Sequence, residues 1–170
     1  FPDVNEDYWA NTAISTMAAL GVINGRSNGH FAPNAYITRA EFAAICARFD
    51  ESGVTGITTF TDTNGHWAEE EISRAAALGW IQGYADGTSR PKQYITRAQA
   101  VTMINRMLCR QPETADDLLN GMRIWSDCQE GDWFYLAIQE ATNSHDFTAK
   151  DRVHESWTDL NKDPDWSRYE

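Results

Sequence analysis

Large apolar residues recur at helical spacing after two nearly identical pentapeptides, Ile-Thr-Arg-Ala-Glu at residues 37–41 and Ile-Thr-Arg-Ala-Gln at residues 95–99. In both stretches the large side chains fall on one helical face. They are Phe42, Ile45 and Phe49 in the first stretch and Val101, Ile104 and Leu108 in the second. A Thr followed three residues later by Glu or Gln forms a capping box, which satisfies free N–H groups at a helix start. The pattern therefore predicts helices that begin after Thr38 and Thr96.

A further helix is predicted ahead of each capped one, over residues 9–20 and 67–78. A glycine, Gly21 or Gly79, follows directly and is a natural left-handed helix stop. A loop rich in turn residues then leads to the capped helix. The sequence thus predicts two helix–loop–helix units of the same design.

The two units are copies of one internal repeat, and this signal outranks the other sequence features. Both contain, in the same order, Phe-x-Asp, Trp-Ala, Leu-Gly, Ile-x-Gly, a turn glycine and a proline before the pentapeptide. A third copy begins at Trp125 and keeps the Trp-to-Ile spacing at Trp133 and Ile138. Residues 143–146 then break the pattern, no Thr-Arg pair follows, and we expect one or two short helices over residues 148–170. The repeats are expected at residues 1–50, 60–110 and 125–170, the last being degenerate.

These residues resemble the S-layer homology (SLH) family. Its repeat reads Phe-x-Asp, Trp-Ala, an Ile, Gly-hydrophobic-Ile-x-Gly, a turn with Gly, a Pro and Thr-Arg-Ala-Glu, and both copies carry nearly all of it over residues 1–108. The resemblance implies an all-α fold in which three helix–loop–helix repeats pack as a pseudo-threefold spindle, one pseudo-trimeric module. Since one unit is too small to bury its own apolar face, the degenerate third unit is expected to close the assembly.

Composition limits the classes of partner. Hydrophobic residues make up 42% of the 170 residues, so the chain should fold. A net charge of −11 argues against a nucleic-acid partner, and no apolar run is long enough for membrane insertion. The three cysteines, Cys46, Cys109 and Cys128, are expected as buried free thiols, with a Cys109–Cys128 bridge left open.

A catalytic interpretation finds little support in the sequence. No Gly-x-Ser-x-Gly motif and no phosphate-binding glycine loop is present. The four histidines, at positions 30, 66, 145 and 154, have no metal-ligand spacing. We therefore expect no catalytic residues, no metal site and no cofactor, and a protein that is not an enzyme.

The pentapeptide arginines, Arg39 and Arg97, stand where a capping box alone would not require them. A cation in the first turn opposes the helix dipole and costs roughly 0.3–1 kcal/mol. A helix N-terminus already favours an anion, and an Arg adds a fork of donors suited to a carboxylate or phosphate. One interpretation is a recurring anion-recognition corner, and the other is an Arg that pairs with an acidic residue of a neighbouring repeat.

The aromatic and glycine positions also have two interpretations each. Trp67 and Trp133 occupy equivalent positions, where they can anchor the core or present a ring to a sugar. Gly25 and Gly83 can serve a turn that needs positive φ, or let a ligand approach the backbone closely. The sequence alone leaves both pairs of alternatives open.

The SLH resemblance implies a particular site. Family members bind secondary cell-wall polymers, commonly through a pyruvylated amino sugar, or peptidoglycan-linked glycans, in grooves between neighbouring repeats. The Arg engages the acidic group, the residues after Gly-hydrophobic-Ile-x line the groove, and a Trp of the following repeat faces the sugar. Carried over, the ligand-binding residues are Gly25, Arg26, Arg39 and Trp67 in the first groove and Gly83, Tyr84, Arg97 and Trp133 in the second. The third repeat lacks the Arg, so we expect at most two competent grooves.

We therefore expect a non-catalytic module that binds cell-wall glycopolymer and anchors a larger surface protein, outside the cell in a bacterial cell wall or S-layer. The alternative is a structural or protein-interaction module for surface-layer assembly, in which the arginines form salt bridges between repeats. A third interpretation is an appendage of a glycan-active enzyme whose catalytic part lies outside this chain.

Overall fold

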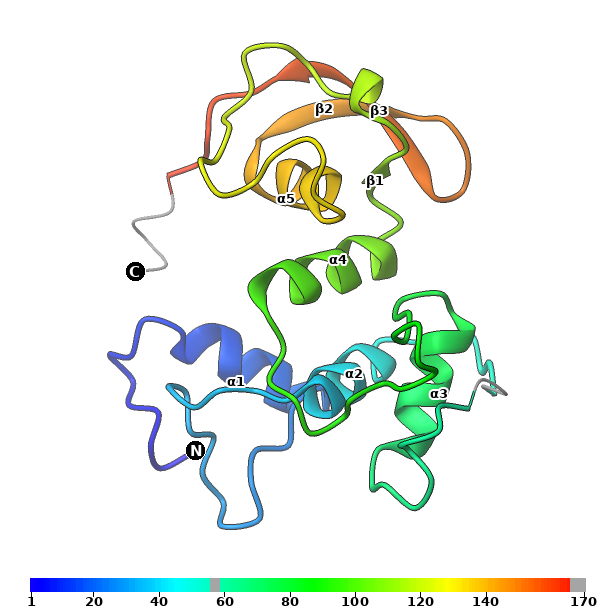
Figure 1. Ribbon diagram of the computed structural model, residues 1–170. Helices are drawn as coiled ribbons and strands as arrows, with labels where there is room; N and C mark the ends of the chain where they lie inside the picture. Colours follow the sequence, from blue (N-terminus) through cyan, green and yellow to red (C-terminus); the bar gives the residue numbers. More distant parts are fainter. Residues whose placement is uncertain (56–58, 166–170) are drawn as a thin grey trace. The chain divides into compact units, whose positions relative to one another are not determined.

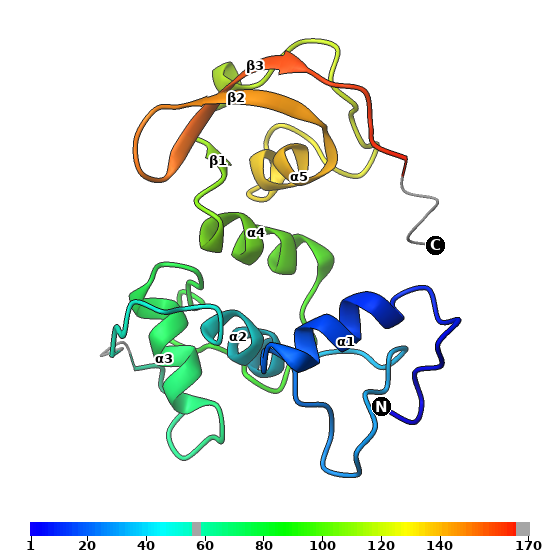
Figure 2. The ribbon, with the colours of Figure 1, turned by 180° about the vertical axis from the view of Figure 1, so that it is seen from behind.

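The computed structural model describes residues 1–55 and 59–165 (Figures 1 and 2). The chain divides into two compact units, and each is described by itself. The first unit contains Phe1–Leu78 and Gln82–Ile95, and the second contains Gly79–Ile81 and Thr96–Pro164. The second repeat therefore contributes its first helix to one unit and its capped helix to the other.

Three helices form the first unit: α1 (Asn11–Ala19), α2 (Arg39–Ala47) and α3 (Glu69–Ala77). Figure 1 shows α2 between α1 and α3, and α2 contacts α3. The most buried face of α2 consists of small residues, namely Ala40, Ala43, Ala44, Cys46 and Ala47. Small side chains let a neighbouring helix approach closely, so the core of this unit is built on alanine, with Ile14 and Ile72 adding larger groups.

The predicted capping boxes at Thr38 and Thr96 and the glycine stop at Gly21 are confirmed. The Thr38 hydroxyl accepts a hydrogen bond from the Glu41 N–H at 3.2 Å, and the Glu41 carboxylate accepts one from the Thr38 N–H at 2.7 Å. The same reciprocal pair joins Thr96 and Gln99 at the start of α4. Gly21, which follows α1, has a φ of 72°, a left-handed conformation that glycine adopts without strain.

The Phe-x-Asp motif fastens the loop between the two helices of a repeat. The Asp3 carboxylate accepts hydrogen bonds from the N–H groups of Phe31 and Ala32, at 2.9 and 2.7 Å. Asp62 does the same for Ser89 and Arg90, both at 2.8 Å. The loop is thus held in one conformation before the chain enters the capped helix.

The second unit contains helices and strands. Its elements are α4 (Arg97–Met107), β1 (Gln111–Pro112), the short 3₁₀ helix η1 (Ala115–Asp117), α5 (Tyr135–Thr142), β2 (His145–Ala149) and β3 (His154–Leu160). The strands form a mixed sheet in the order β1-β3-β2, with β1 parallel and β2 antiparallel to β3. Figure 1 shows α5 against this curved sheet, and α4 packs on α5.

The prediction of an all-α fold is therefore wrong, because the described residues form five α-helices and a three-stranded mixed sheet. The short helices expected after residue 147 are replaced by the β2–β3 hairpin, and residues 166–170 lie outside the described residues. In β3 the buried residues alternate, Glu155 and Trp157 facing inward, which is the period of a strand. Asp151 forms the turn by accepting hydrogen bonds from the N–H groups of Val153 and His154.

A buried charged cluster holds the hairpin against α5. Arg110 pairs with Glu140 on α5 at 3.0 Å and with Glu155 on β3 at 2.6 Å. The imidazole of His145 lies 3.3 Å from Glu140 and 3.1 Å from Glu155, and it stacks on Trp157 with ring centroids 4.0 Å apart. Apolar side chains are scarce in this part of the sequence, and ion pairs and hydrogen bonds take their place.

Two further expectations are tested by the structure. The three cysteines are free thiols, with Cys46 and Cys128 buried, but Cys109 is exposed, contrary to the expectation that it is buried. The Cys109–Cys128 disulfide, which the sequence left as an alternative, is not formed. In the described part of the chain, no helix combines the length and apolar character needed to cross a membrane.

Candidate ligand-binding groove

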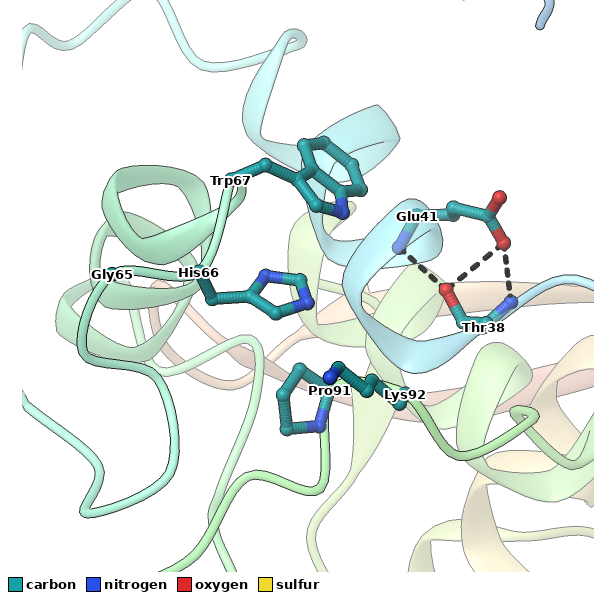
Figure 3. Close-up of a pocket in the computed structure, with 7 residues that line it drawn as sticks. All are labelled: Thr38, Glu41, Gly65, His66, Trp67, Pro91 and Lys92. Atoms are coloured by element: carbon teal, nitrogen blue, oxygen red, sulfur yellow. Dashed lines mark hydrogen bonds between the residues drawn. The ribbon is translucent and has the colours of Figure 1, made fainter.

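A groove of about 380 Å³ lies in the first unit at the start of α2. Its lining residues come from both repeats (Figure 3): Thr38, Glu41, Gly65, His66, Trp67, Pro91 and Lys92. The first two belong to the capping box of the first repeat, and the other five belong to the second repeat. The groove is therefore lined by residues of both repeats, and of the predicted site residues it includes Trp67.

Aromatic and cationic groups of the second repeat form one side of the groove. Trp67 is 62% exposed, and its indole lies beside the ring of His66, with centroids 5.6 Å apart. The Ala68 N–H donates to Nδ1 of His66, which leaves the Nε2 position of the neutral ring to carry the proton. Lys92 adds a positive charge. An apolar ring face beside N–H donors and a cation suits a sugar with an acidic substituent.

Arg39 lies next to the groove and contacts the second repeat. Its Nε donates to the backbone oxygen of Ser89 at 2.8 Å, and its guanidinium carbon lies 5.1 Å from the centre of the Tyr84 ring. Arg90 lies over the same ring at 3.7 Å. Burial lowers the pKa of the Arg39 guanidinium below its ordinary value. The structure thus brings together Arg39 and Tyr84, two of the predicted site residues.

Arg39, Tyr84 and Arg90 form a cluster that is connected to the groove along the backbone. Arg39 follows Thr38, and Arg90 precedes Pro91, so both arginines are covalent neighbours of groove residues. Among the described residues, the two terminal nitrogens of Arg39 make no hydrogen bond or ion pair.

The two predicted site glycines have a structural explanation. A Cβ on Gly25 would lie 2.4 Å from the ring of Phe1, and one on Gly83 would lie 2.3 Å from the ring of Phe60. The close approach that glycine permits is therefore used by the phenylalanine of the Phe-x-Asp motif. Gly25 also has a φ of 68°, as the turn interpretation required. Arg26, the next residue, closes its own loop through a backbone hydrogen bond to His30.

Arg97 and Trp133, predicted for the second groove, both belong to the second unit. Arg97 is exposed and is the first residue of α4, whereas Trp133 precedes α5. Trp133 is 66% exposed and meets Phe134 edge to face. Their shared role in a groove stays a prediction.

The tryptophans that start each repeat are exposed to nearly the same degree, Trp9 and Trp67 at 62% and Trp133 at 66%. Most of each ring is therefore available, and the core-anchor interpretation does not describe them well. Trp9 shares the repeat position of the other two, a signal that could have added it to the candidates. His66 and Lys92 have no equivalent in the motif, so only the fold shows that they line the groove.

Repeated helix–loop–helix units with exposed tryptophans define a module built from repeats. The sequence profile of the S-layer homology domain matches residues 1–43 and 59–101, together half of the chain. The chain belongs to the S-layer homology family, as its motifs indicated.

The chain is similar to several surface proteins of bacteria. It is 34% identical to cell surface glycoprotein 1 of Acetivibrio thermocellus over 164 residues, 89% of this chain and 7% of that protein. It is 36% identical to the cellulosome-anchoring protein of the same organism over 154 residues, 86% of this chain and 33% of that protein. The surface layer protein of Brevibacillus choshinensis is 34% identical over 115 residues, 64% of this chain and 10% of that protein. The chain spans a third or less of the length of these relatives.

Membership of this family establishes the role and the location of the chain. The chain is a cell-surface anchoring module, located outside the cell in a cell wall or S-layer. SLH repeats are generally non-catalytic, and an enzyme among the relatives, an endoglucanase of a Bacillus species, aligns over only 12% of its length.

Proposed function

We propose that the module anchors a larger surface protein by binding an acidic cell-wall glycopolymer in the groove at the start of α2. The observation that carries this proposal is the arrangement of Trp67, His66 and Lys92 around a groove between the two well-matched repeats. The polymer can be a secondary cell-wall polysaccharide with a pyruvyl group or a peptidoglycan-linked glycan. The module itself performs no chemistry in this role.

Each side chain has a physical task in the proposed complex. The exposed face of Trp67 stacks on the apolar face of a sugar ring. Lys92 attracts the acidic substituent, and the terminal nitrogens of Arg39 provide a planar fork for it. Thr38 and Glu41 fix the N-terminus of α2 through the capping box, which holds this wall of the groove in one geometry.

A structural role for Arg39 is the second candidate, and one observation favours it. The bond from Arg39 to Ser89 joins residues of different repeats, which is what an assembly function would require. The partner is a backbone oxygen and no carboxylate, so the contact is a neutral-acceptor hydrogen bond rather than the salt bridge expected. Such a bond contributes about 1.5–3 kcal/mol when one partner is charged. Both roles can reside in one side chain, since the bond uses only Nε.

Sedimentation of the chain with cell-wall sacculi of its host tests the proposal. We expect binding to intact sacculi and its loss after mild acid removes pyruvyl groups and polymer substituents. Binding that survives the acid would redirect the proposal to the peptidoglycan backbone. No binding to either preparation would contradict it and leave the structural-interaction role.

A further inference from the structure

Two tyrosines form an exposed aromatic pair on the first unit. Tyr36 and Tyr94 are 79% and 59% exposed, and their ring centroids lie 5.3 Å apart at a tilt of 37°. They occupy equivalent positions, each directly before the Ile-Thr-Arg-Ala pentapeptide of its repeat. Single exposed aromatic residues are ordinary on protein surfaces. A contacting pair contributed by two repeats presents a continuous apolar surface.

The backbone beneath the two rings is held in place. Thr38 and Tyr94 form an antiparallel bridge, and the Ile95 N–H donates to the Ile37 oxygen at 3.1 Å. The Arg39 N–H donates to the Gln93 oxygen at 2.8 Å. These bonds fix both tyrosines to the segment that begins α2. A ligand would therefore meet rings that need little ordering on binding.

The tyrosine pair is continuous with the groove. Residues paired across an antiparallel bridge have their side chains on the same face, so Tyr94 lies on the face of Thr38. Thr38 lines the groove, and the contact between the rings brings Tyr36 to the same surface. Lys92, on the other side of the groove, precedes Tyr94 by two residues. A chain that leaves the groove at this end meets the two rings.

The size of the groove makes such an exit necessary for a polymer. Its volume of about 380 Å³ is near the lower limit of ligand pockets, which range over roughly 300–1,000 Å³. The groove therefore holds a short segment, and the remainder of a glycan chain continues across the surface.

We propose that Tyr36 and Tyr94 form a second sugar-binding platform, on which a neutral pyranose ring of the same glycan stacks outside the groove. The inference rests on the proposed function, because it takes the ligand to be a polymer bound in the groove. Aromatic faces bind the C–H surface of a sugar, and the tyrosine hydroxyls can bond its hydroxyl groups. Two contacts on one chain raise its affinity above that of either alone, because the second contact is made within the bound complex.

The test compares a long and a short ligand on three forms of the full chain: wild type, Y36A/Y94A and Y36F/Y94F. The probes are wall polymer extracted from host sacculi and its hydrolysis fragments of one or two sugar units. We expect Y36A/Y94A to weaken polymer binding about tenfold and to leave fragment binding unchanged. Y36F/Y94F retains the rings and should retain most of the polymer affinity. Leu20→Ala, at another strongly exposed apolar residue of this unit, is the matched control and should change neither affinity.

The outcomes separate the platform from the groove. Unchanged polymer affinity in Y36A/Y94A would overturn the platform while leaving the groove in place. An equal loss of polymer and fragment affinity would also overturn it, since the tyrosines would then belong to the groove. If the wild-type chain bound neither probe, the proposed function itself would fail. Circular dichroism and thermal unfolding would check that each variant is folded. We expect all of them to fold, because the substituted positions are exposed.

Discussion

The first and third repeats begin alike and end differently. Trp9 and Trp133 stand at equivalent positions before α1 and α5, and both rings are largely exposed. The first repeat then continues through a fastened loop to Thr38 and the capped helix α2, whereas the third continues into the β2–β3 hairpin. One type of first helix can therefore be completed in two ways.

The two completions use different physical means. Helix α2 buries a face of alanines and Cys46, which needs no polar partner. The hairpin buries Glu155 near Glu140, Arg110 forms an ion pair with each carboxylate, and the His145 ring lies against Glu155. The groove depends on the capping box at the start of the second helix, so a repeat completed by a hairpin cannot form the same site. This comparison predicts where the two regions are most sensitive to substitution.

The largest effect is expected at Arg110, the cation of the hairpin cluster. Replacing it with Met would leave Glu140 and Glu155 buried without their ion pair, and should lower the free energy of unfolding by about 3 kcal/mol. Urea unfolding followed by near-ultraviolet circular dichroism measures the loss. Arg123→Met is the control, since Arg123 pairs with Asp163 at an exposed position and should change stability by at most about 1 kcal/mol. Equal effects of the two substitutions would show that the cluster does not hold the hairpin.

An intermediate effect is expected at Gly83 in the well-matched second repeat. An added Cβ would lie 2.3 Å from the Phe60 ring and 2.9 Å from the backbone oxygen of Thr88, so Gly83→Ala should destabilise the chain by about 2 kcal/mol through overpacking. Gly131→Ala provides the matched control, because nothing lies within 4 Å of a Cβ there and its φ is not positive. Thermal unfolding compares the two variants. A Gly83→Ala protein as stable as Gly131→Ala would contradict the packing explanation for this glycine.

The smallest effect is a pH dependence carried by Glu140, which faces Arg110, His145, Glu155 and Trp157. Burial raises the pKa of Glu140 above its ordinary value of 4.5. The folded state therefore holds this proton more tightly than the unfolded state, and the contribution to stability is present below pH 4.5 and lost as pH rises through the folded pKa. We expect the stability of wild type relative to Glu140→Gln to fall as the pH rises above 4.5, as measured by urea unfolding. A difference that stays constant or grows over this interval would show that Glu140 is not the group responsible.

The repeat motifs made the helix boundaries of the first two repeats largely predictable. The capping boxes at Thr38 and Thr96 and the stop at Gly21 are local features, determined by hydrogen bonds within a few residues, and the structure confirms them. The family and the cell-surface setting followed from the same residues.

The third repeat was predicted wrongly because its final fold depends on distant partners. Glu155 alternates with Trp157 in a strand pattern, but the stretch is short and rich in charge, and short helices were predicted for it. Its burial is explained by partners outside its strand, above all Arg110, which lies 45 residues away in the sequence. In the groove, His66 and Lys92 were missed for a similar reason, since their positions outside the motif have meaning only once the loops are folded.

The most direct test of the proposed anchoring role is the affinity of Trp67→Ala and Trp9→Ala for extracted wall polymer. The two tryptophans have equivalent repeat positions and equal exposure, but of the two only Trp67 lines the groove. We expect Trp67→Ala to weaken binding about tenfold or more and Trp9→Ala to bind like wild type. Equal affinities of both variants and wild type would contradict glycan recognition in this groove.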